Sequence, residues 1–298
     1  MGAVVAGLLL AAPARANPAL ADGMHALDVN GTSRHYVLRV PASTENPRPL
    51  VLVLHGGGGH GENAERMTGF TPIARREGFI VAYPEGSGRL RHALLTWNAG
   101  HCCGYAMEKQ VDDVAFLRTL IDHLVANAGA DPHRVYVTGM SNGAMMAHRA
   151  GIALAGKVAA IAPVVGTLFG DEAPPDRPVS LLAINGAQDA SVPPAGGAPG
   201  GRFASSWDGM PALPAATQGE FWAKANGCSP TATATTKGAV SRWRYACPNG
   251  LSVERVLVAD NGHAWPGGVA GNRRGDTPST AFAASEEIWQ FFRTHVLP

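Results

Sequence analysis

Short, continuous apolar runs alternate with stretches of helical character along most of this chain. The runs are Leu50–Leu54, Phe79–Tyr83, Arg134–Thr138, Val158–Val165, Ser180–Ile184 and Val253–Ala259. Strands that are apolar on both faces are typical of a parallel sheet, because helices cover both sides of such a sheet. The pattern therefore predicts an α/β fold with a mostly parallel central sheet and helices on both faces.

Local sequence signals predict the remaining elements. His25–Val29 and Arg34–Val40 are expected to pair as a hairpin around a glycine-containing turn. The spacing of apolar side chains predicts helices at Glu108–Asn127, Asn142–Leu154, Thr217–Asn226 and Ser279–His295. Thr217 and Glu220 have the spacing of a capping box. Gly196–Pro214 is rich in Gly, Pro and Ala and is expected to be a long surface loop.

The composition is that of a globular protein, with 46% hydrophobic and 16% charged residues. A net charge of +1 gives no overall field that would attract nucleic acid or an anionic membrane. Residues 1–16 carry a short apolar run and the triplet Ala14-Arg15-Ala16, which predicts a secretory signal peptide. We therefore expect a secreted, extracellular or periplasmic protein. Residues 17–298 are expected to form a single domain with no separate lid and no membrane-spanning segment.

Four cysteines are consistent with export. Cys228 and Cys247 flank a polar stretch, and a disulfide between them would contribute about 3 kcal/mol in the chain-entropy model. The adjacent Cys102 and Cys103 are open to two interpretations, a vicinal disulfide or two buried thiols. A metal site is the least favoured, because no second Cys/His pair at ligand spacing accompanies them. The sequence predicts neither a metal nor an organic cofactor.

The segment Gly139-Met140-Ser141-Asn142-Gly143 follows an expected strand and precedes an expected helix. This is the strand–turn–helix context of the G-x-S-x-G nucleophile elbow, in which a sharp turn exposes the serine. We therefore predict that Ser141 is a nucleophile.

A glycine-rich segment, His55-Gly56-Gly57-Gly58-Gly59, directly follows the expected strand Leu50–Leu54. Bare backbone N–H groups there can form an oxyanion hole together with the N–H of Asn142, the residue after the nucleophile. A phosphate-binding loop is disfavoured, because neither a G-K-[ST] ending nor a G-x-G-x-x-G spacing is present. His55 is expected to be structural.

The histidine that would act as general base for Ser141, and the aspartate that would orient it, are predicted from their positions after strands. His263 follows the last expected strand in a Gly/Pro-rich loop, and Asp189 follows the strand before it. Asp171, Asp176, Asp208 and Asp260 are rivals for the acid by chain order. Asp112 and Asp113 are expected to begin or face a helix. The order Ser, Asp, His is that of the α/β-hydrolases.

Five motifs together resemble the polyhydroxybutyrate depolymerase-like esterases, a group that includes feruloyl and acetyl xylan esterases. They are His55-Gly56-Gly57-Gly58-Gly59, Thr96-Trp97-Asn98-Ala99-Gly100-His101-Cys102-Cys103-Gly104, Val111-Asp112-Asp113-Val114, Gly139-Met140-Ser141-Asn142-Gly143 and Gly262-His263-Ala264-Trp265-Pro266-Gly267. The resemblance runs from about Val29 to the C-terminus and implies an α/β-hydrolase fold.

The same resemblance implies roles for individual residues. Ser141, Asp189 and His263 would form the triad, and Gly57 and Asn142 would donate to the oxyanion. It also implies a disulfide between Cys228 and Cys247. Trp265 would line the substrate groove, and Trp97 is a second candidate substrate contact.

The resemblance predicts ester hydrolysis through an acyl-enzyme, with a hydroxyalkanoate polyester or its oligomers as the first expected substrate. Feruloyl or acetyl esters of plant polysaccharide are an alternative. Another is an amidase acting on an anionic polymer such as poly(aspartate), whose carboxylates could contact Arg89, Arg91, Arg273 or Arg274. An alternative from a different class is a secreted, non-catalytic binding protein on a hydrolase scaffold.

Overall fold

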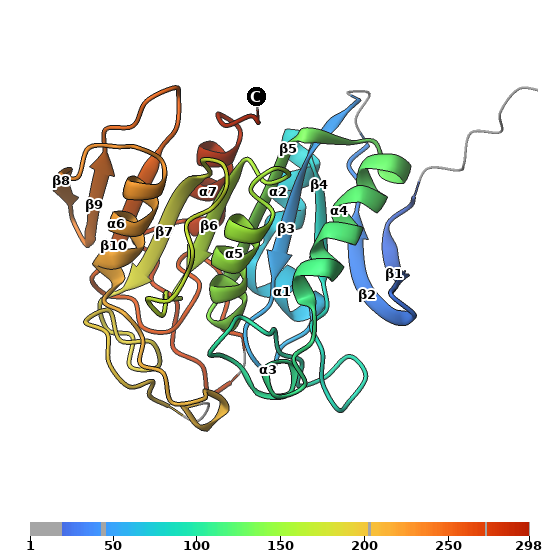
Figure 1. Cartoon of the computed structure of the whole chain (residues 1–298), viewed down its shortest axis with the longest axis horizontal. Coiled ribbons are helices and arrows are strands. Elements are labelled where there is room, and N and C mark those ends of the chain that lie inside the picture. The colour runs from blue at the N-terminus through green and yellow to red at the C-terminus, as the bar shows by residue number, and fades with distance from the viewer. Residues whose placement is uncertain (1–19, 43–45, 202–203, 272, 298) are drawn as a thin grey trace, which may run out of the picture.

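The computed structural model describes residues 20–42, 46–201, 204–271 and 273–297. The predicted leader, residues 1–16, lies outside them. In the described part a ten-stranded sheet has the order β1-β2-β4-β3-β5-β6-β7-β10-β9-β8 (Figure 1). Its strands are β1 Gly23–Val29, β2 Thr32–Arg39, β3 Arg48–Leu54, β4 Ile80–Pro84, β5 Ala130–Met140, β6 Ala160–Val164, β7 Ser180–Gly186, β8 Ala232–Lys237, β9 Val240–Tyr245 and β10 Val253–Val258.

The centre of the sheet is parallel and its edges are antiparallel. Neighbouring strands from β4 through β3, β5, β6 and β7 to β10 all pair in parallel. The β1–β2 hairpin adds antiparallel strands at one edge and β8–β9 at the other. Each predicted apolar run overlaps one of the six parallel strands, so the predicted α/β class is confirmed.

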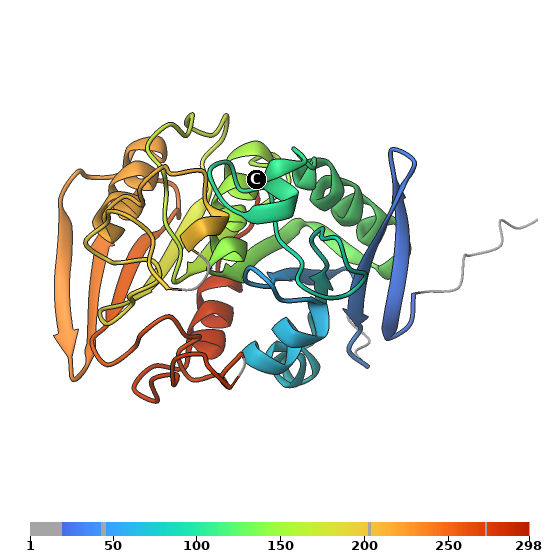
Figure 2. The ribbon, with the colours of Figure 1, turned by 90° about the horizontal axis from the view of Figure 1, so that it is seen from below.

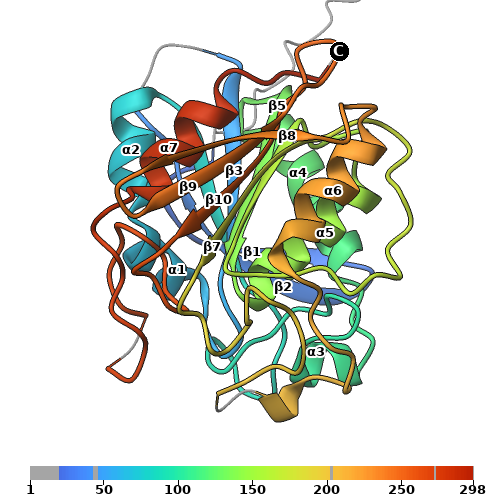
Figure 3. The same ribbon diagram turned by 90° about the vertical axis from the view of Figure 1, so that its left-hand side faces the viewer.

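Helices cover both faces of this sheet (Figures 2 and 3). One face carries α4, α5 and α6, and the other carries α1, α2 and α7. Their bounds are α1 Gly61–Thr68, α2 Phe70–Glu77, α3 Gly104–Glu108, α4 Asp113–Ala128, α5 Asn142–Ala153, α6 Ala215–Ala225 and α7 Ala284–Phe292. No described helix is both long and apolar enough to cross a membrane.

The position of β3 in the centre of the sheet explains why its residues are apolar without alternation. Leu50 and Leu52 belong to the core on one side of the sheet, together with Phe116 of α4. Val51 and Val53 belong to the core on the other side, together with Phe292 of α7. Because successive side chains point to opposite faces, a strand buried on both faces needs apolar residues at every position.

Two predictions about elements need correction, and one hairpin was not predicted. The hairpin β8–β9 was not expected, because the Thr- and Ala-rich β8 is mostly exposed and has no apolar alternation. The helix expected from Glu108 is divided into α3 and α4, with Asp112 as the N-cap of α4. The capping box at Thr217 is wrong: α6 begins after Pro214, and the Thr217 hydroxyl donates to Pro214 O.

Candidate active site

Ser141 lies on the sharp turn between β5 and α5. Its backbone has φ 56° and ψ −122°, and its N–H donates to Val164 O (3.0 Å). A Cβ on Gly139 would lie within 2.8 Å of Leu54 Cβ, and one on Gly143 within 2.6 Å of Leu54 O. The two glycines are therefore required by close packing against β3, and they allow the turn that presents Ser141 at the strand end.

Ser141, His263 and Asp189 form one hydrogen-bonded chain. His263 Nε2 lies 2.8 Å from Ser141 Oγ, and His263 Nδ1 lies 2.8 Å from Asp189 Oδ2. The residues come from three separate loops, after β5, β10 and β7 respectively. Proton transfer from a serine to a histidine that a carboxylate orients needs this arrangement.

The carboxylate of Asp189 is held in place by backbone groups. Its Oδ1 accepts hydrogen bonds from the N–H groups of Ser191 and Val192, both at 2.8 Å. The residue is 4% exposed, so these bonds are shielded from water. This leaves Oδ2 directed at His263, while Oδ1 closes a tight turn onto the residues two and three positions after Asp189.

The four rival aspartates lie elsewhere. Asp171 and Asp208 bind the two ring nitrogens of His101. Asp260 accepts a hydrogen bond from the Ser279 hydroxyl. Asp176 has no hydrogen bond or ion pair with another described residue.

The loop that carries His263 is anchored by two residues that the sequence analysis did not single out. The backbone N–H of His263 donates to Asp276 Oδ2 (2.6 Å). Asn261, which is fully buried, donates from Nδ2 to Ala264 O (3.0 Å). No spacing rule connects Asp276 with His263, because the chain returns to this point only through an irregular loop.

Gly57 and Asn142 lie side by side next to Ser141. A Cβ on Gly57 would be 3.7 Å from Asn142 Cβ. Neither backbone N–H makes a hydrogen bond to another residue in the described ranges. The side chain of Asn142 is clamped by the Trp97 backbone, accepting from Trp97 N–H (2.7 Å) and donating to Trp97 O (3.0 Å). Two N–H groups are thus available near Ser141, as an oxyanion hole requires.

His55 is buried and structural. Its Nδ1 donates to Gly56 O (2.8 Å), and its Nε2 accepts from Gly86 N–H (3.0 Å). Burial lowers the pKa of His55 to about 4, so the ring is neutral near neutral pH. The ring therefore ties the glycine-rich segment to the chain after β4.

The two tryptophans differ in position. Trp265 lines the cleft beside Ser141, although it is only 1% exposed and its indole N–H donates to Ser285 Oγ (3.0 Å). Trp97 is fully buried, donates its indole N–H to His55 O (3.0 Å) and does not line that cleft. The expected substrate contact at Trp97 is therefore corrected to a position behind the site, since its aromatic ring packs against His55 and Phe116.

A cleft of about 580 Å³ opens at Ser141, and we call it the Ser141 cleft. Its lining includes Gly56 to His60, Asn63, Met67, Met140, Ser191, His263, Trp265, Val269, Arg274 and Asp276. Met67 and Val269 are joined by a backbone hydrogen bond (3.1 Å) and give the cleft an apolar side with Trp265. Of the arginines considered from the sequence, Arg274 lines this cleft, whereas Arg89 and Arg91 line another pocket.

The cysteines form two disulfides. Cys228 and Cys247 are bonded, which confirms the expected pair. Cys102 and Cys103 are joined as a vicinal disulfide, so the first of the two interpretations applies. Among the described residues no group of three or more His, Cys, Asp or Glu side chains could hold a metal ion.

Comparison with known proteins identifies relatives along most of the chain. The sequence profile of the esterase PHB depolymerase family matches residues 34–220. NocK from Nocardia uniformis subsp. tsuyamanensis, which is named as an esterase, is 34% identical over 81% of this chain and 73% of its own length. Feruloyl esterase B from Piromyces equi is 31% identical over 80% of this chain, which spans only 44% of that protein.

A solved structure shows the same fold. The acetyl xylan esterase from Aspergillus awamori superposes with a TM-score of 0.60, covering 91% of this chain and 99% of its own, at 16% identity. The α/β-hydrolase fold expected from the motifs is confirmed.

Proposed function

Since the chain belongs to the esterase PHB depolymerase family and is a carboxylic ester hydrolase, we propose that it uses a serine mechanism with Ser141, His263 and Asp189 as its triad. The observation that carries the proposal is the continuous hydrogen-bonded chain, with 2.8 Å at each of its two links. Gly57 and Asn142 are proposed to donate their free N–H groups to the oxyanion.

In the proposed mechanism His263 Nε2 takes the proton from Ser141 Oγ, which attacks the ester carbonyl carbon. Asp189 holds the ring and stabilises the imidazolium that forms. The carbonyl oxygen becomes an oxyanion between the N–H groups of Gly57 and Asn142. His263 then protonates the leaving alcohol, and a water molecule activated by His263 hydrolyses the acyl-enzyme.

We propose a hydroxyalkanoate polyester or its oligomers as substrate, following the family description. Feruloyl esters are a second candidate, which the similarity to a feruloyl esterase favours. Secretion and a single catalytic domain remain part of the proposal.

The test is a hydrolysis panel on wild-type protein and its Ser141→Ala variant. The substrates are p-nitrophenyl acetate and butyrate, methyl ferulate, a 3-hydroxybutyrate oligomer and poly(aspartate). We expect Ser141→Ala to lower turnover on the order of 10⁶-fold, as removal of a serine nucleophile does in other hydrolases. The matched control is Ser241→Ala on the exposed hairpin β8–β9, which should retain wild-type turnover.

Equal turnover by Ser141→Ala and the wild type on every substrate would contradict the serine mechanism. A folded wild-type protein that hydrolyses none of them, and whose Ser141 resists a serine-directed phosphonate, would support the non-catalytic alternative instead.

A further inference from the structure

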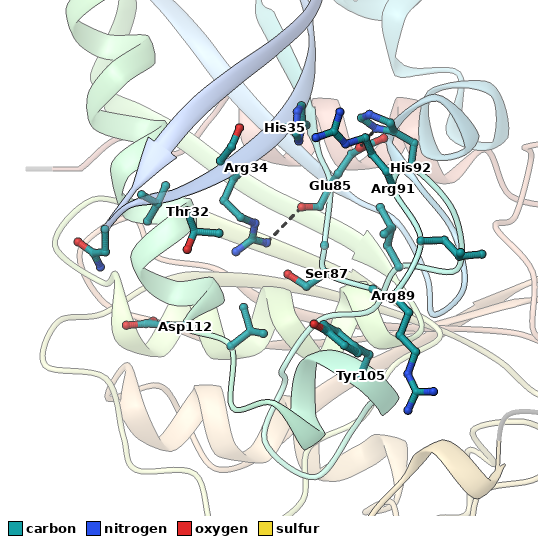
Figure 4. Close-up of a pocket in the computed structure, with 18 residues that line it drawn as sticks. Thr32, Arg34, His35, Glu85, Ser87, Arg89, Arg91, His92, Tyr105 and Asp112 are labelled. Carbon is teal, nitrogen blue, oxygen red and sulfur yellow. Dashed lines mark hydrogen bonds and ion pairs between the residues drawn. The ribbon is translucent and has the colours of Figure 1, made fainter.

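A second pocket, which shares no lining residue with the Ser141 cleft, lies against the β1–β2 hairpin. It measures about 600 Å³ and is lined by Val29, Asn30, residues 32–35, residues 85–92, Leu95, Tyr105, Val111 and Asp112. We call it the Arg34 pocket (Figure 4). Nothing in the proposed mechanism uses these residues, so the pocket needs its own explanation.

The side chain of Arg34 is buried but only partly paired. Its Nη2 donates to Asp113 Oδ1 (2.7 Å) and to Glu85 O (3.2 Å), and the guanidinium lies 4.1 Å over the ring of Phe116. The Nε–H and both Nη1–H groups have no hydrogen-bond partner among the described residues. Three donors on a side chain that is 7% exposed are thus directed at the pocket.

Hydroxyl groups surround the same space. Thr32, Ser33, Ser87 and Tyr105 line the pocket, and their hydroxyls make no hydrogen bond to another described residue. In Figure 4 the guanidinium of Arg34 and the hydroxyls of Ser87 and Tyr105 are turned toward the interior. Hydroxyls that both donate and accept, beside an aromatic ring, suit a ligand that itself carries many hydroxyls.

The pocket also presents exposed guanidinium groups. Arg34 is paired with Asp113, and Glu85 is hydrogen-bonded to His92. Arg89 and Arg91 are exposed and form no ion pair with a residue in the described ranges. The carboxylates of Glu85 and Asp112 also line the pocket, so the arginines act there as local donors and not through a net positive charge. Guanidinium groups at a site with free N–H donors favour a carboxylate.

We propose that the Arg34 pocket binds an acidic oligosaccharide through a uronate unit. The carboxylate would be bound by Arg34 and Arg91, and the ring hydroxyls by Ser87, Tyr105 and Asp112. A pocket of about 600 Å³ is much larger than a lone carboxylate needs, which favours a ligand of several sugar units over a simple anion. This inference does not depend on the proposed catalytic residues, because the two sites share no lining residue.

The test is calorimetric titration of the full protein with an α-linked galacturonic acid trimer. Maltotriose serves as the neutral saccharide and tricarballylate as an acid without hydroxyls. We expect saturable binding of the acidic trimer alone. Arg91→Gln and Tyr105→Leu should each raise its Kd about tenfold, the loss expected for one charge-assisted bond or one aromatic contact. The matched control is Arg177→Gln, another exposed arginine that lines none of these pockets.

Hydrolysis of a p-nitrophenyl ester serves as a folding check, and Arg91→Gln should keep wild-type turnover. Arg34 is avoided as a test position, because its buried ion pair with Asp113 makes unfolding an expected result. Equal binding of tricarballylate and the trimer would overturn the saccharide assignment. Absence of binding by the trimer would overturn the site. The site would also be overturned if the trimer inhibited ester hydrolysis competitively and Arg91→Gln left its Kd unchanged, because the trimer would then bind in the Ser141 cleft.

Discussion

At the scale of single residues, His148 shows how burial fixes a protonation state. The ring is 1% exposed; it pairs Nε2 with Gln218 Oε1 (2.8 Å) and accepts from Trp222 Nε1–H at Nδ1 (3.0 Å). Burial lowers its pKa to about 4, against about 6.5 in the unfolded chain. Between these two values the unfolded chain binds a proton that the folded protein does not. Stability is therefore full above pH 6.5 and falls as pH drops toward 4, by at most about 1.4 kcal/mol per pH unit.

We predict that His148→Leu lowers the free energy of unfolding at pH 7 by about 1–3 kcal/mol for each partner left unpaired. The variant also removes the titrating group, so the gap to the wild type should narrow as pH falls to 5. Urea unfolding of both proteins at pH 7, 6 and 5 measures this. His133→Leu, at an exposed position, is the control and should run parallel to the wild type. A gap for His148→Leu that stays constant with pH would contradict a neutral buried ring.

The candidate site could be predicted where position along the chain determines position in space. Ser141, Asp189 and His263 each follow a parallel strand, and the carboxyl ends of such strands meet at one edge of the sheet. Asp276 and the buried position of Trp97 could not be predicted in this way. Both depend on how irregular loops pack, and the sequence carries no periodic signal for that.

At the scale of elements, burial decided which strands could be recognised. Four of the parallel strands (β3, β4, β6 and β7) and the second half of β5 are buried on both faces, whereas β10 is half-buried at Glu254, Arg255 and Leu257. All six were predicted from their apolar runs. β8 and β9 were missed, because an exposed edge hairpin needs no apolar pattern. The segment expected as the surface loop Gly196–Pro214 includes a short 3-10 helix, Ala204–Ser206. A backbone bridge between Trp207 and Cys102 fixes it to the rest of the protein, and a bridge between Gly197 and Ala212 closes the segment on itself.

This segment is also held by His101. Its Nδ1 lies 2.7 Å from Asp208 Oδ2 and its Nε2 lies 2.9 Å from Asp171 Oδ2, so the ring joins three loops. The hydrogen bond to Asp171, more than that to Asp208, raises the pKa of His101 above 6.5. A raised pKa in the folded state stabilises the contact fully below pH 6.5, and this stabilisation is lost as pH rises through the folded-state value.

We therefore predict that residues 204–210 exchange their amide hydrogens faster at pH 8 than at pH 6 in the wild type, after correction for intrinsic rates. The expected change is about two- to fivefold, as for a solvent-screened pair. In His101→Gln the exchange should be fast at both pH values, while α4 serves as an internal control. A corrected wild-type rate that is the same at pH 6 and pH 8 would show that His101 does not hold the segment.

At the scale of the whole molecule, one sheet separates two cores, and its edges differ in how they are secured. The β1–β2 edge is covered in part by α4, since Tyr36 packs in the same core as Phe116 and Leu120. The β8–β9 edge is largely exposed, and the Cys228–Cys247 disulfide fixes the end of β9 to the end of α6. The sequence predicted the parallel centre, but not which strand lies at each edge, because strand order depends on crossovers that leave no local pattern.

The disulfide is the place where this edge can be tested. Replacing both partners, as Cys228→Ser with Cys247→Ser, opens the covalent loop between two cysteines that are 19 residues apart in the chain. We predict a loss of about 3 kcal/mol in the free energy of unfolding, because the unfolded chain regains loop entropy. For a protein of this size that corresponds to a fall in Tm of roughly 5 °C by calorimetry. Ester hydrolysis at 25 °C should be unchanged, because neither cysteine lines the Ser141 cleft. A single transition shifted to lower temperature would mean that the edge hairpin unfolds with the rest. An unchanged Tm, or a separate early transition that leaves the main one in place, would show that the edge does not share in the cooperative unfolding of the sheet.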